Sequence, residues 1–137
     1  MELNYRDARE EDAEAVAEIA NSYVMSEDLS VDSMRDLVQD RTMKVVEEED
    51  ELVGYVSYRA VEDTVVVQHI CVVPEYRETE VPGRLVSFPV EFADEEGMKT
   101  RAAVDENSWF TDFLPGEGFA EKGEARFAGD TLVVYEL

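Results

Sequence analysis

Residues 65–85 read VVVQHICVVPEYRETEVPGRL and carry the strongest local signal in the chain. The stretch from Thr64 to Val73 is rich in β-branched residues and almost unbroken in its apolar character, which is typical of a central strand buried on both faces. Pro74 ends this strand, and Pro82 fits the first turn of a following helix, where its missing N–H is not needed. The sequence therefore predicts a strand, a turn and a helix start, whose converging N–H groups can bind a phosphate.

Composition limits the classes of protein and partner. With 137 residues, 45% of them hydrophobic, the chain fits one compact domain spanning residues 1–137. Its 34 acidic and 12 basic residues give a net charge of −22, which repels nucleic acid and anionic membranes, so neither is expected as a partner. The acidic residues are spread among ordinary apolar periodicity, and we interpret them as halophilic surface solvation.

The sequence contains no recognisable metal-binding motif and no pair of cysteines for a disulfide. One His and one Cys cannot form a structural zinc site, and no EF-hand spacing is present, so no metal is expected. Cys71 has no partner for an intramolecular disulfide, which favours a reducing compartment. The N-terminus lacks the basic and apolar regions of a leader, and no apolar run approaches ~18 residues, so we expect a soluble cytoplasmic protein.

Hydrophobic periodicity gives the remaining elements. Gly54 lies inside a strand, where it marks a bulge or close packing, and Pro89 should kink or divide its helix. A cap at Ser30 or Asp32 predicts a short helix that runs through Val38. The other expected helices cover 10–23, 82–97 and 108–114, and the expected strands cover 3–6, 43–46, 52–58, 64–73, 100–104, 119–127 and 131–136. The order β-α-α-β-β-β-α-β-α-β-β indicates a mixed-sheet α/β domain.

Three local patterns follow one another along this framework: Arg6 with Glu11-Asp12-Ala13, then Val72-Val73-Pro74-Glu75-Tyr76-Arg77, then Asn107 followed by Gly118-Phe119. Together with the element order from Tyr5 to Leu137, they resemble the GNAT superfamily of acyl-CoA-dependent N-acyltransferases. The resemblance implies an α/β (α+β) fold with a mixed, mainly antiparallel central sheet flanked by helices. It also implies acetyl-CoA as the acyl donor and a small-molecule amine or a peptide N-terminus as the acceptor. A homodimer is an open alternative for the assembly.

The resemblance also assigns the acetyl-CoA contacts. Backbone amides at Val72 and Val73 would hold the acyl-pantetheine arm in a splay beside the central strand, and Asn107 would touch the cofactor from the exit of the next strand. The phosphate contacts would come from the loop after the central strand, at Arg77, Glu78, Thr79, Gly83 and Arg84.

This loop departs from the family pattern Arg/Gln-x-x-Gly-x-Gly/Ala, because Glu80 and Pro82 replace the two glycines. Pro82 has no N–H for a phosphate, and Glu80 adds a side chain and a like charge. Arg77 and Arg84 either flank the phosphates or pair with neighbouring glutamates on a solvated face. At molar salt the Debye length falls to about 3 Å, which screens repulsion from exposed carboxylates.

The catalytic positions depart as well. Leu114 stands where many relatives have a tyrosine that protonates the departing thiolate, and Val66 and Ala102 stand where relatives have a general-base glutamate. His69, the single histidine, is the candidate general base, acting directly or through water; a histidine packed on a strand face has the same signature.

Other side chains offer weaker substitutes for the missing groups. Tyr55, Tyr58 and Tyr76 are candidate proton donors, and each also suits ordinary strand packing. Cys71 can form an acyl-enzyme only if a cation stabilises its thiolate; otherwise it is a buried structural cysteine.

Two functions remain open. The first is an N-acetyltransferase in which the amine attacks the thioester directly, while the protein supplies position and amide donors. By the resemblance, its acceptor pocket would lie between residues 22–31 and the final hairpin. The apolar candidates for its lining, each of which also suits the core, are Tyr23, Met25, Trp109 and Phe110. The second is a catalytically inactive GNAT-fold binding or interaction protein that has lost the pyrophosphate loop and the general acid. An unrelated fold would lack a splay between the strands that end near Val73 and Val104.

Overall fold

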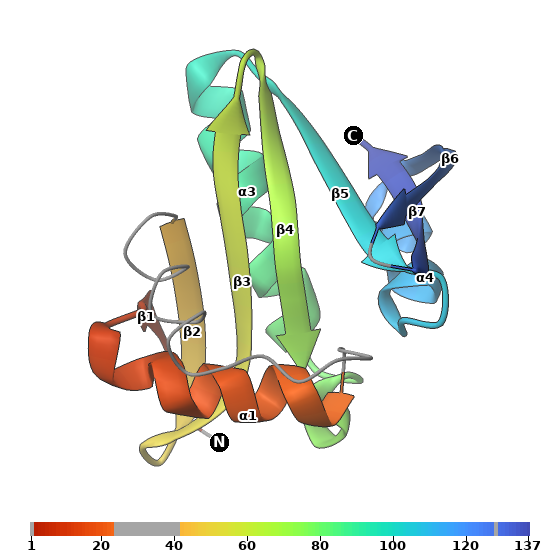
Figure 1. The fold of residues 1–137 in the computed structure, drawn as a ribbon. Helices are drawn as coiled ribbons and strands as arrows, with labels where there is room; N and C mark the ends of the chain where they lie inside the picture. The colour runs from red at the N-terminus through yellow and green to blue at the C-terminus, as the bar shows by residue number, and fades with distance from the viewer. Residues whose placement is uncertain (1, 24–41, 128) are drawn as a thin grey trace.

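A computed structural model describes residues 2–23, 42–127 and 129–137, and it contains one seven-stranded sheet in the order β1-β2-β3-β4-β5-β7-β6 (Figure 1). The strands are β1 (Leu3–Asp7), β2 (Thr42–Glu48), β3 (Glu51–Val61), β4 (Thr64–Val72), β5 (Lys99–Asp105), β6 (Ala120–Phe127) and β7 (Asp130–Glu136). The helices are α1 (Ala13–Tyr23), α3 (Val81–Glu96) and α4 (Phe110–Phe113), with short 3₁₀ turns η1 (Glu10–Asp12), η2 (Pro74–Tyr76) and η3 (Leu114–Glu117). The short helix expected to run through Val38 lies outside the described residues.

The sheet is mixed and mainly antiparallel, as the sequence predicts. Among the described strands, β4 and β5 form the parallel pair, and the other neighbours are antiparallel. Parallel neighbours need a crossover connection, and α3 supplies it. The expected hairpins are confirmed as β2–β3 and β6–β7.

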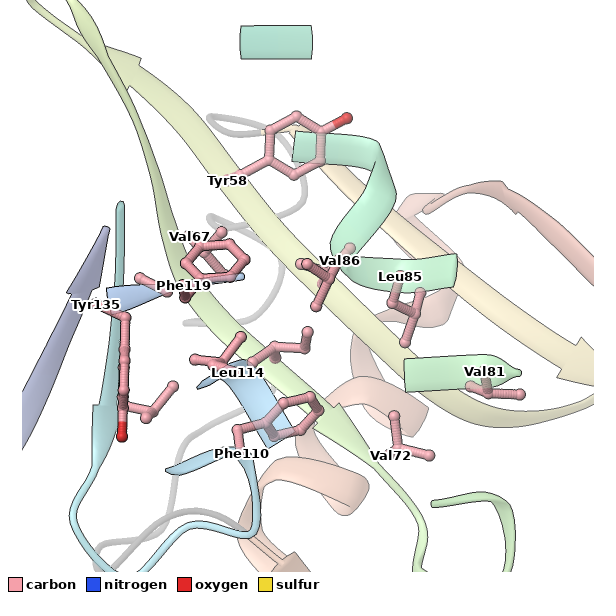
Figure 2. Close-up of a cluster of buried hydrophobic side chains, with 14 of the residues drawn as sticks. Tyr58, Val67, Val72, Val81, Leu85, Val86, Phe110, Leu114, Phe119 and Tyr135 are labelled. Carbon is pink, nitrogen blue, oxygen red and sulfur yellow. The ribbon is translucent and has the colours of Figure 1, made fainter. Parts of the chain in front are cut away.

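The two faces of the sheet are covered by different helices. On one face, α1 packs Val16 and Ala20 against a cluster that includes Tyr55 and Cys71. On the other face, α3 packs Leu85 and its neighbours against a larger cluster that extends to β5 and β7 and is called the α3-side cluster below (Figure 2). Strand β4 contributes side chains to both clusters, which confirms that it is buried on both faces.

Gly54 lies both at a β-bulge and at a close packing contact, the two roles that the sequence predicts for it. The β2–β3 register shifts so that Val46 pairs with Gly54 and Glu47 pairs with Leu52, which leaves Val53 as an extra, bulged residue. A Cβ atom at Gly54 would lie 3.1 Å from the Cys71 carbonyl oxygen and 3.2 Å from Leu85 Cδ1. The missing side chain lets α3 approach the sheet closely.

The expected division of the long helix at Pro89 is wrong. Helix α3 runs from Val81 to Glu96 with a buried Pro89 in its interior, and Gly97 ends it in the left-handed conformation at φ 68°. Proline removes one helical hydrogen bond. Burial of the same face against the sheet, where Leu85, Val86 and Ala93 lie, offsets that loss and keeps the helix continuous.

A partly buried ionic network joins the first strand to the first helix. Arg6 donates to both carboxylate oxygens of Asp12, at 2.7 and 3.0 Å, and to Glu47 at 3.2 Å. The Arg9 amide also donates to Asp12, at 2.7 Å. The hydrogen bond from Arg6 lowers the pKa of Asp12, although burial of the carboxyl opposes this. The network fixes the start of α1 against β1 and β2.

We predict that Arg6→Met lowers the free energy of unfolding by about 2 kcal/mol, because it leaves two partly buried carboxylates without their partner. Arg9→Met is the matched control: the Arg9–Glu11 pair is exposed and 3.8 Å long, and its loss should change stability by less than about 0.5 kcal/mol. Urea unfolding in molar KCl measures both. Equal losses in the two variants would contradict the assignment.

The same network predicts a pH dependence. Because the folded-state pKa of Asp12 is lowered, its stabilising contribution is present above the unfolded-state value of about 4 and is lost as the pH falls through the folded-state value. The difference in stability between the wild type and Arg6→Met should therefore be constant near neutral pH and narrow below about pH 4.

Candidate functional site

The candidate site is the splay between β4 and β5. The two strands pair from Thr64 to Val67 on β4 and from Lys99 to Ala102 on β5, and they then diverge (Figure 1). Beyond this point β5 continues to pair with β7 as far as Asp105, so the C-terminal strands form a separate wing. The splay lies where the sequence places it, and its walls are the end of β4 and the exit of β5.

The two residues expected to hold an acyl-pantetheine arm, Val72 and Val73, direct their backbone N–H groups to opposite edges of β4. The Val73 amide donates to the Val53 carbonyl at 2.9 Å, so it is used in pairing with β3. Because alternate residues of an antiparallel strand face opposite edges, the Val72 N–H and C=O point away from β3 and into the splay. Val72 therefore has the geometry expected of an arm-binding residue, and Val73 does not offer its N–H.

Arg77 lies at the mouth of the splay. Its Nε donates to the Val72 carbonyl at 3.0 Å, which brings the guanidinium back over the end of β4. A cation in this position can meet an anionic ligand that enters along β4.

The start of α3 offers fewer amides than a phosphate-binding helix start normally does. The Thr79 amide donates to the Tyr76 carbonyl at 3.3 Å, and the Val81 amide donates to Thr79 Oγ1 at 3.2 Å. Pro82 has no N–H. In this described segment, the backbone amides of Glu78, Glu80 and Gly83 remain as donors for a phosphate. The Glu80 carboxylate carries the same sign of charge as a phosphate.

Arg84 points elsewhere. Its guanidinium carbon lies 4.7 Å from the centre of the Phe88 ring and 5.8 Å from that of Tyr5, and Nη1 donates to Ser87 Oγ at 3.2 Å. Glu91 lies 3.8 Å from the same nitrogen. These contacts direct Arg84 along the side of α3 toward β1. Arg77 and Arg84, for which the sequence predicts the same role, therefore lie in different environments.

Asn107 and α4 form the opposite wall of the splay. Asn107 is exposed just after β5, where its amide donates to Asp105 Oδ1 at 2.9 Å. A Cβ atom at Gly83 would lie 4.0 Å from Phe113 Cζ and 3.9 Å from Glu117 Oε1, so α4 and η3 approach the first turn of α3. Phe110 is buried in the α3-side cluster beside the end of β4 (Figure 2), where it serves as core.

Two positions where relatives carry proton-transfer groups are buried among apolar side chains in this protein. Leu114 is 1% exposed and packs in the α3-side cluster, and Ala102 is buried there too. Among the candidate tyrosines, Tyr58 packs against Phe92 with ring centres 6.0 Å apart, and the Tyr76 hydroxyl donates to Glu48. The hydrogen bond to Glu48 raises the pKa of Tyr76 to about 12. Both tyrosines are thus engaged away from the splay.

His69 lies on the α1 side of β4. It pairs with Ser57 of β3, two residues from the Tyr55–Cys71 pair that packs beneath α1. Its partly buried imidazole therefore stands close to the start of the splay, on the face opposite α3. Residues 24–31, expected to line an acceptor pocket, lie outside the described residues.

Sequence reasoning missed two polar groups beside His69. The β3–β4 register shifts so that Ser57 pairs with His69 and Tyr58 pairs with Val67, which leaves Gln68 as an extra residue. Ser57 Oγ and Gln68 Oε1 are buried and have no hydrogen-bond partner among the residues that the structure describes. The signal was present in the sequence, since Gln68 interrupts an otherwise apolar strand.

A second hollow, of about 500 Å³, lies between α1 and the β2–β3 turn. Six carboxylates and one guanidinium are among the residues that line it, so it does not suit an anionic cofactor. The lining is Arg6, Glu11, Asp12, Ala15, Glu18, Ile19, Glu47, Asp50, Glu51, Leu52 and Val73. Within the described ranges, no group of three His, Cys, Asp or Glu side chains is placed to hold a metal ion. None of the helices in those ranges is long and apolar enough to cross a membrane.

Comparisons with known proteins agree with this geometry. A family model described as an acetyltransferase (GNAT) domain matches residues 6–135. Similar solved structures include Ard1 from Thermoplasma volcanium, at TM-score 0.86 and 17% identity over 100% of this chain and 97% of that one. They include PaiA N-acetyltransferase from Thermoplasma acidophilum in complex with coenzyme A, at TM-score 0.77 and 14% identity over 100% of both chains.

Another similar structure is the ribosomal-protein-S18-alanine N-acetyltransferase from Escherichia coli, at TM-score 0.80 and 13% identity over 99% of this chain and 93% of that one. At these identities the structures show a shared fold. A comparison with curated protein sequences gave no match.

Cys71 is placed as a structural cysteine. It is 1% exposed, and burial raises the pKa of its thiol to about 12, although the charge of Arg77 acts in the opposite direction. We predict that the native protein resists an aromatic disulfide reagent at pH 8 and that the protein unfolded in guanidinium reacts with one equivalent. Rapid modification of the native protein would show that Cys71 is a reactive thiolate, and would support the hypothesis of a Cys71 acyl-enzyme.

Proposed function

This chain belongs to the GNAT acetyltransferase family, and on that basis we propose that it transfers an acetyl group from acetyl-CoA to an amine. The observation that carries the proposal is the splay, with the Val72 N–H and C=O directed into it and Arg77 at its mouth. Those groups suit the amide-containing arm and the anionic end of acetyl-CoA.

The residues fit the two ends of acetyl-CoA unequally. Val72 would hold the pantetheine arm, and Asn107 would contact it from the other wall. Arg77, with the amides of Glu78, Glu80 and Gly83, would hold the phosphates, while the Thr79 amide is already used within the turn. The fit is good along β4 and reduced at the start of α3, where Val81 and Pro82 offer no donor.

Bound acetyl-CoA supplies an activated acetyl thioester. This chain contributes position and hydrogen bonding, because Val66, Ala102 and Leu114 cannot exchange a proton. The acceptor amine would approach from the α1 side and attack the acetyl carbon directly. Water or His69 would receive its proton, since the other titratable side chain of β4 on that face, Cys71, is a buried thiol whose pKa is raised.

The acceptor is proposed as a small-molecule amine or a peptide N-terminus. The similar structures include an enzyme named for the N-terminal alanine of a ribosomal protein, and this supports a peptide acceptor. We infer a cytoplasmic and salt-adapted protein from the net charge of −22 and the single buried cysteine. A homodimer is compatible with these features.

We predict micromolar binding of acetyl-CoA in molar KCl, measured by calorimetry. Arg77→Glu should weaken it at least about tenfold, because it replaces a cation at the splay with a like charge. Arg84→Glu is the matched control and should change affinity less than about threefold, since its guanidinium rests on Phe88. Equal losses in the two variants would show that the phosphates lie elsewhere.

Transfer itself is measured as thiol release with acetyl-CoA and two probes, 2-phenylethylamine and the amide of Ala-Ala-Ala. His69→Gln should lower kcat while acetyl-CoA affinity stays unchanged, if His69 receives the proton. Absence of thiol release from a protein that binds acetyl-CoA would reject transfer to both probe classes.

A binding or interaction protein without transfer activity is the second candidate. The observation that favours it is the start of α3, where Thr79 Oγ1 accepts the Val81 N–H and Pro82 has none. In this case the splay would be a remnant of the fold, and neither acetyl-CoA binding nor thiol release would occur.

Pro82→Ala separates the two candidates. If acetyl-CoA is bound, the restored N–H in the first turn of α3 should raise its affinity at least about tenfold, because a hydrogen bond to a charged group contributes about 1.5–3 kcal/mol. Pro115→Ala, an exposed proline in η3, is the matched control and should leave affinity unchanged. Undetectable binding in the wild type and in both variants, with each protein folded, favours the second candidate.

A further inference from the structure

The extra residue in β4 turns two neighbouring side chains to one face of the sheet. Val67 and Ile70 both belong to the α3-side cluster, although residues three apart in a regular strand face opposite sides. The bulge at Gln68 removes the conflict, because Gln68 and His69 then oppose the single residue Ser57. Ser57, Gln68 and His69 thus gather on the α1 side of the sheet.

This polar group lies at the apex of the splay. Gln68 directly follows Val67, the last β4 residue that pairs with β5. An acetyl group held beyond this point by the Val72 backbone would have the bulge at its inner end. Helices α3 and α4 and their apolar side chains cover the opposite face, and α1 covers the face of Ser57 and Gln68 around Tyr55 and Cys71, so the proposed acceptor would approach beside α1.

Two oxygen atoms in the group lack partners that burial normally requires. Ser57 is 0% exposed, and neither its Oγ nor Gln68 Oε1 accepts or donates a hydrogen bond in the structure. Buried polar atoms without partners cost folding free energy and are uncommon. The register places these two on neighbouring strands at the bulge, next to the last β4 residue that pairs with β5, where a ligand could supply the missing partners.

We propose that Gln68 Oε1 and Ser57 Oγ receive the N–H groups of the acceptor amine and orient its lone pair toward the acetyl carbon. Both groups are uncharged hydrogen-bond acceptors, so they suit the neutral amine and not an ammonium ion. As the N–C bond forms and the C–S bond breaks, the nitrogen loses one proton and the departing sulfur gains one. This inference rests on the proposed transferase function.

The test compares Gln68→Met and Ser57→Ala with the wild type. Ser57→Ala removes only the hydroxyl oxygen, whereas Gln68→Met replaces the whole amide group, Nε2 included, with an apolar side chain of similar shape. Ser87→Ala is the control, because Ser87 lies on α3 and its hydroxyl donates to the Arg84 carbonyl at 2.6 Å. Thermal unfolding, acetyl-CoA calorimetry and thiol release with 2-phenylethylamine are measured for each protein.

We expect each test variant to raise the Tm by about 2–5 °C, since it removes an unpaired buried polar atom. The KM for 2-phenylethylamine should rise at least about tenfold, while acetyl-CoA affinity stays within about twofold of the wild type. Ser87→Ala should show neither change. A lower Tm in both test variants, or an unchanged KM, would overturn the inference.

Failure of the proposed function gives a different result. In that case the wild type itself shows no acetyl-CoA binding and no thiol release, and both proposals fall together. If the wild type is active and only the KM effect is missing, the transferase stands and the role of Gln68 and Ser57 is rejected.

Discussion

The early end of the β4–β5 pairing is the constraint on which the rest of the site depends. After Val67 and Ala102 the two strands separate, and β5 follows β7 into the C-terminal wing. The backbone groups of β4 that face the gap then have no strand partner and need another one. Arg77 meets this need for the Val72 carbonyl in the protein as described. An interruption of the sheet thereby becomes a polar edge that can recognise an amide-containing ligand.

Much of the fold could be predicted because its signals are local. Turn residues and apolar periodicity mark the hairpins, α1 and the crossover helix, and the first turn of α3 accepts Pro82 without loss. The bulge at Gln68 could not be placed in the same way. The strand from Thr64 is apolar on both faces, so it shows no alternation from which the direction of each residue can be deduced.

That missing direction limits what the sequence can say about the site. Because of the one extra residue in β4, the backbone N–H and C=O of Val72 face the splay, and the side chains of His69 and Gln68 lie on the same face of the sheet. Long side chains add a second limit, since spacing gives their neighbourhood but not their contacts. Arg84 rests on Phe88, whereas Arg77 folds back onto β4.

In the transferase that we propose, the altered helix start would affect binding of acetyl-CoA more than the chemistry at the acetyl group. A hydrogen bond to a charged group contributes about 1.5–3 kcal/mol, so the loss of donors at Val81 and Pro82 corresponds to a fall in affinity of about a hundredfold or more. The phosphates are remote from the reacting carbon, and such binding energy raises the rate only where it is used for orientation. In this proposal Val72 and the bulge would line the inner end of the splay. Affinity for acetyl-CoA is therefore the property that distinguishes a working transferase from an inactive relative.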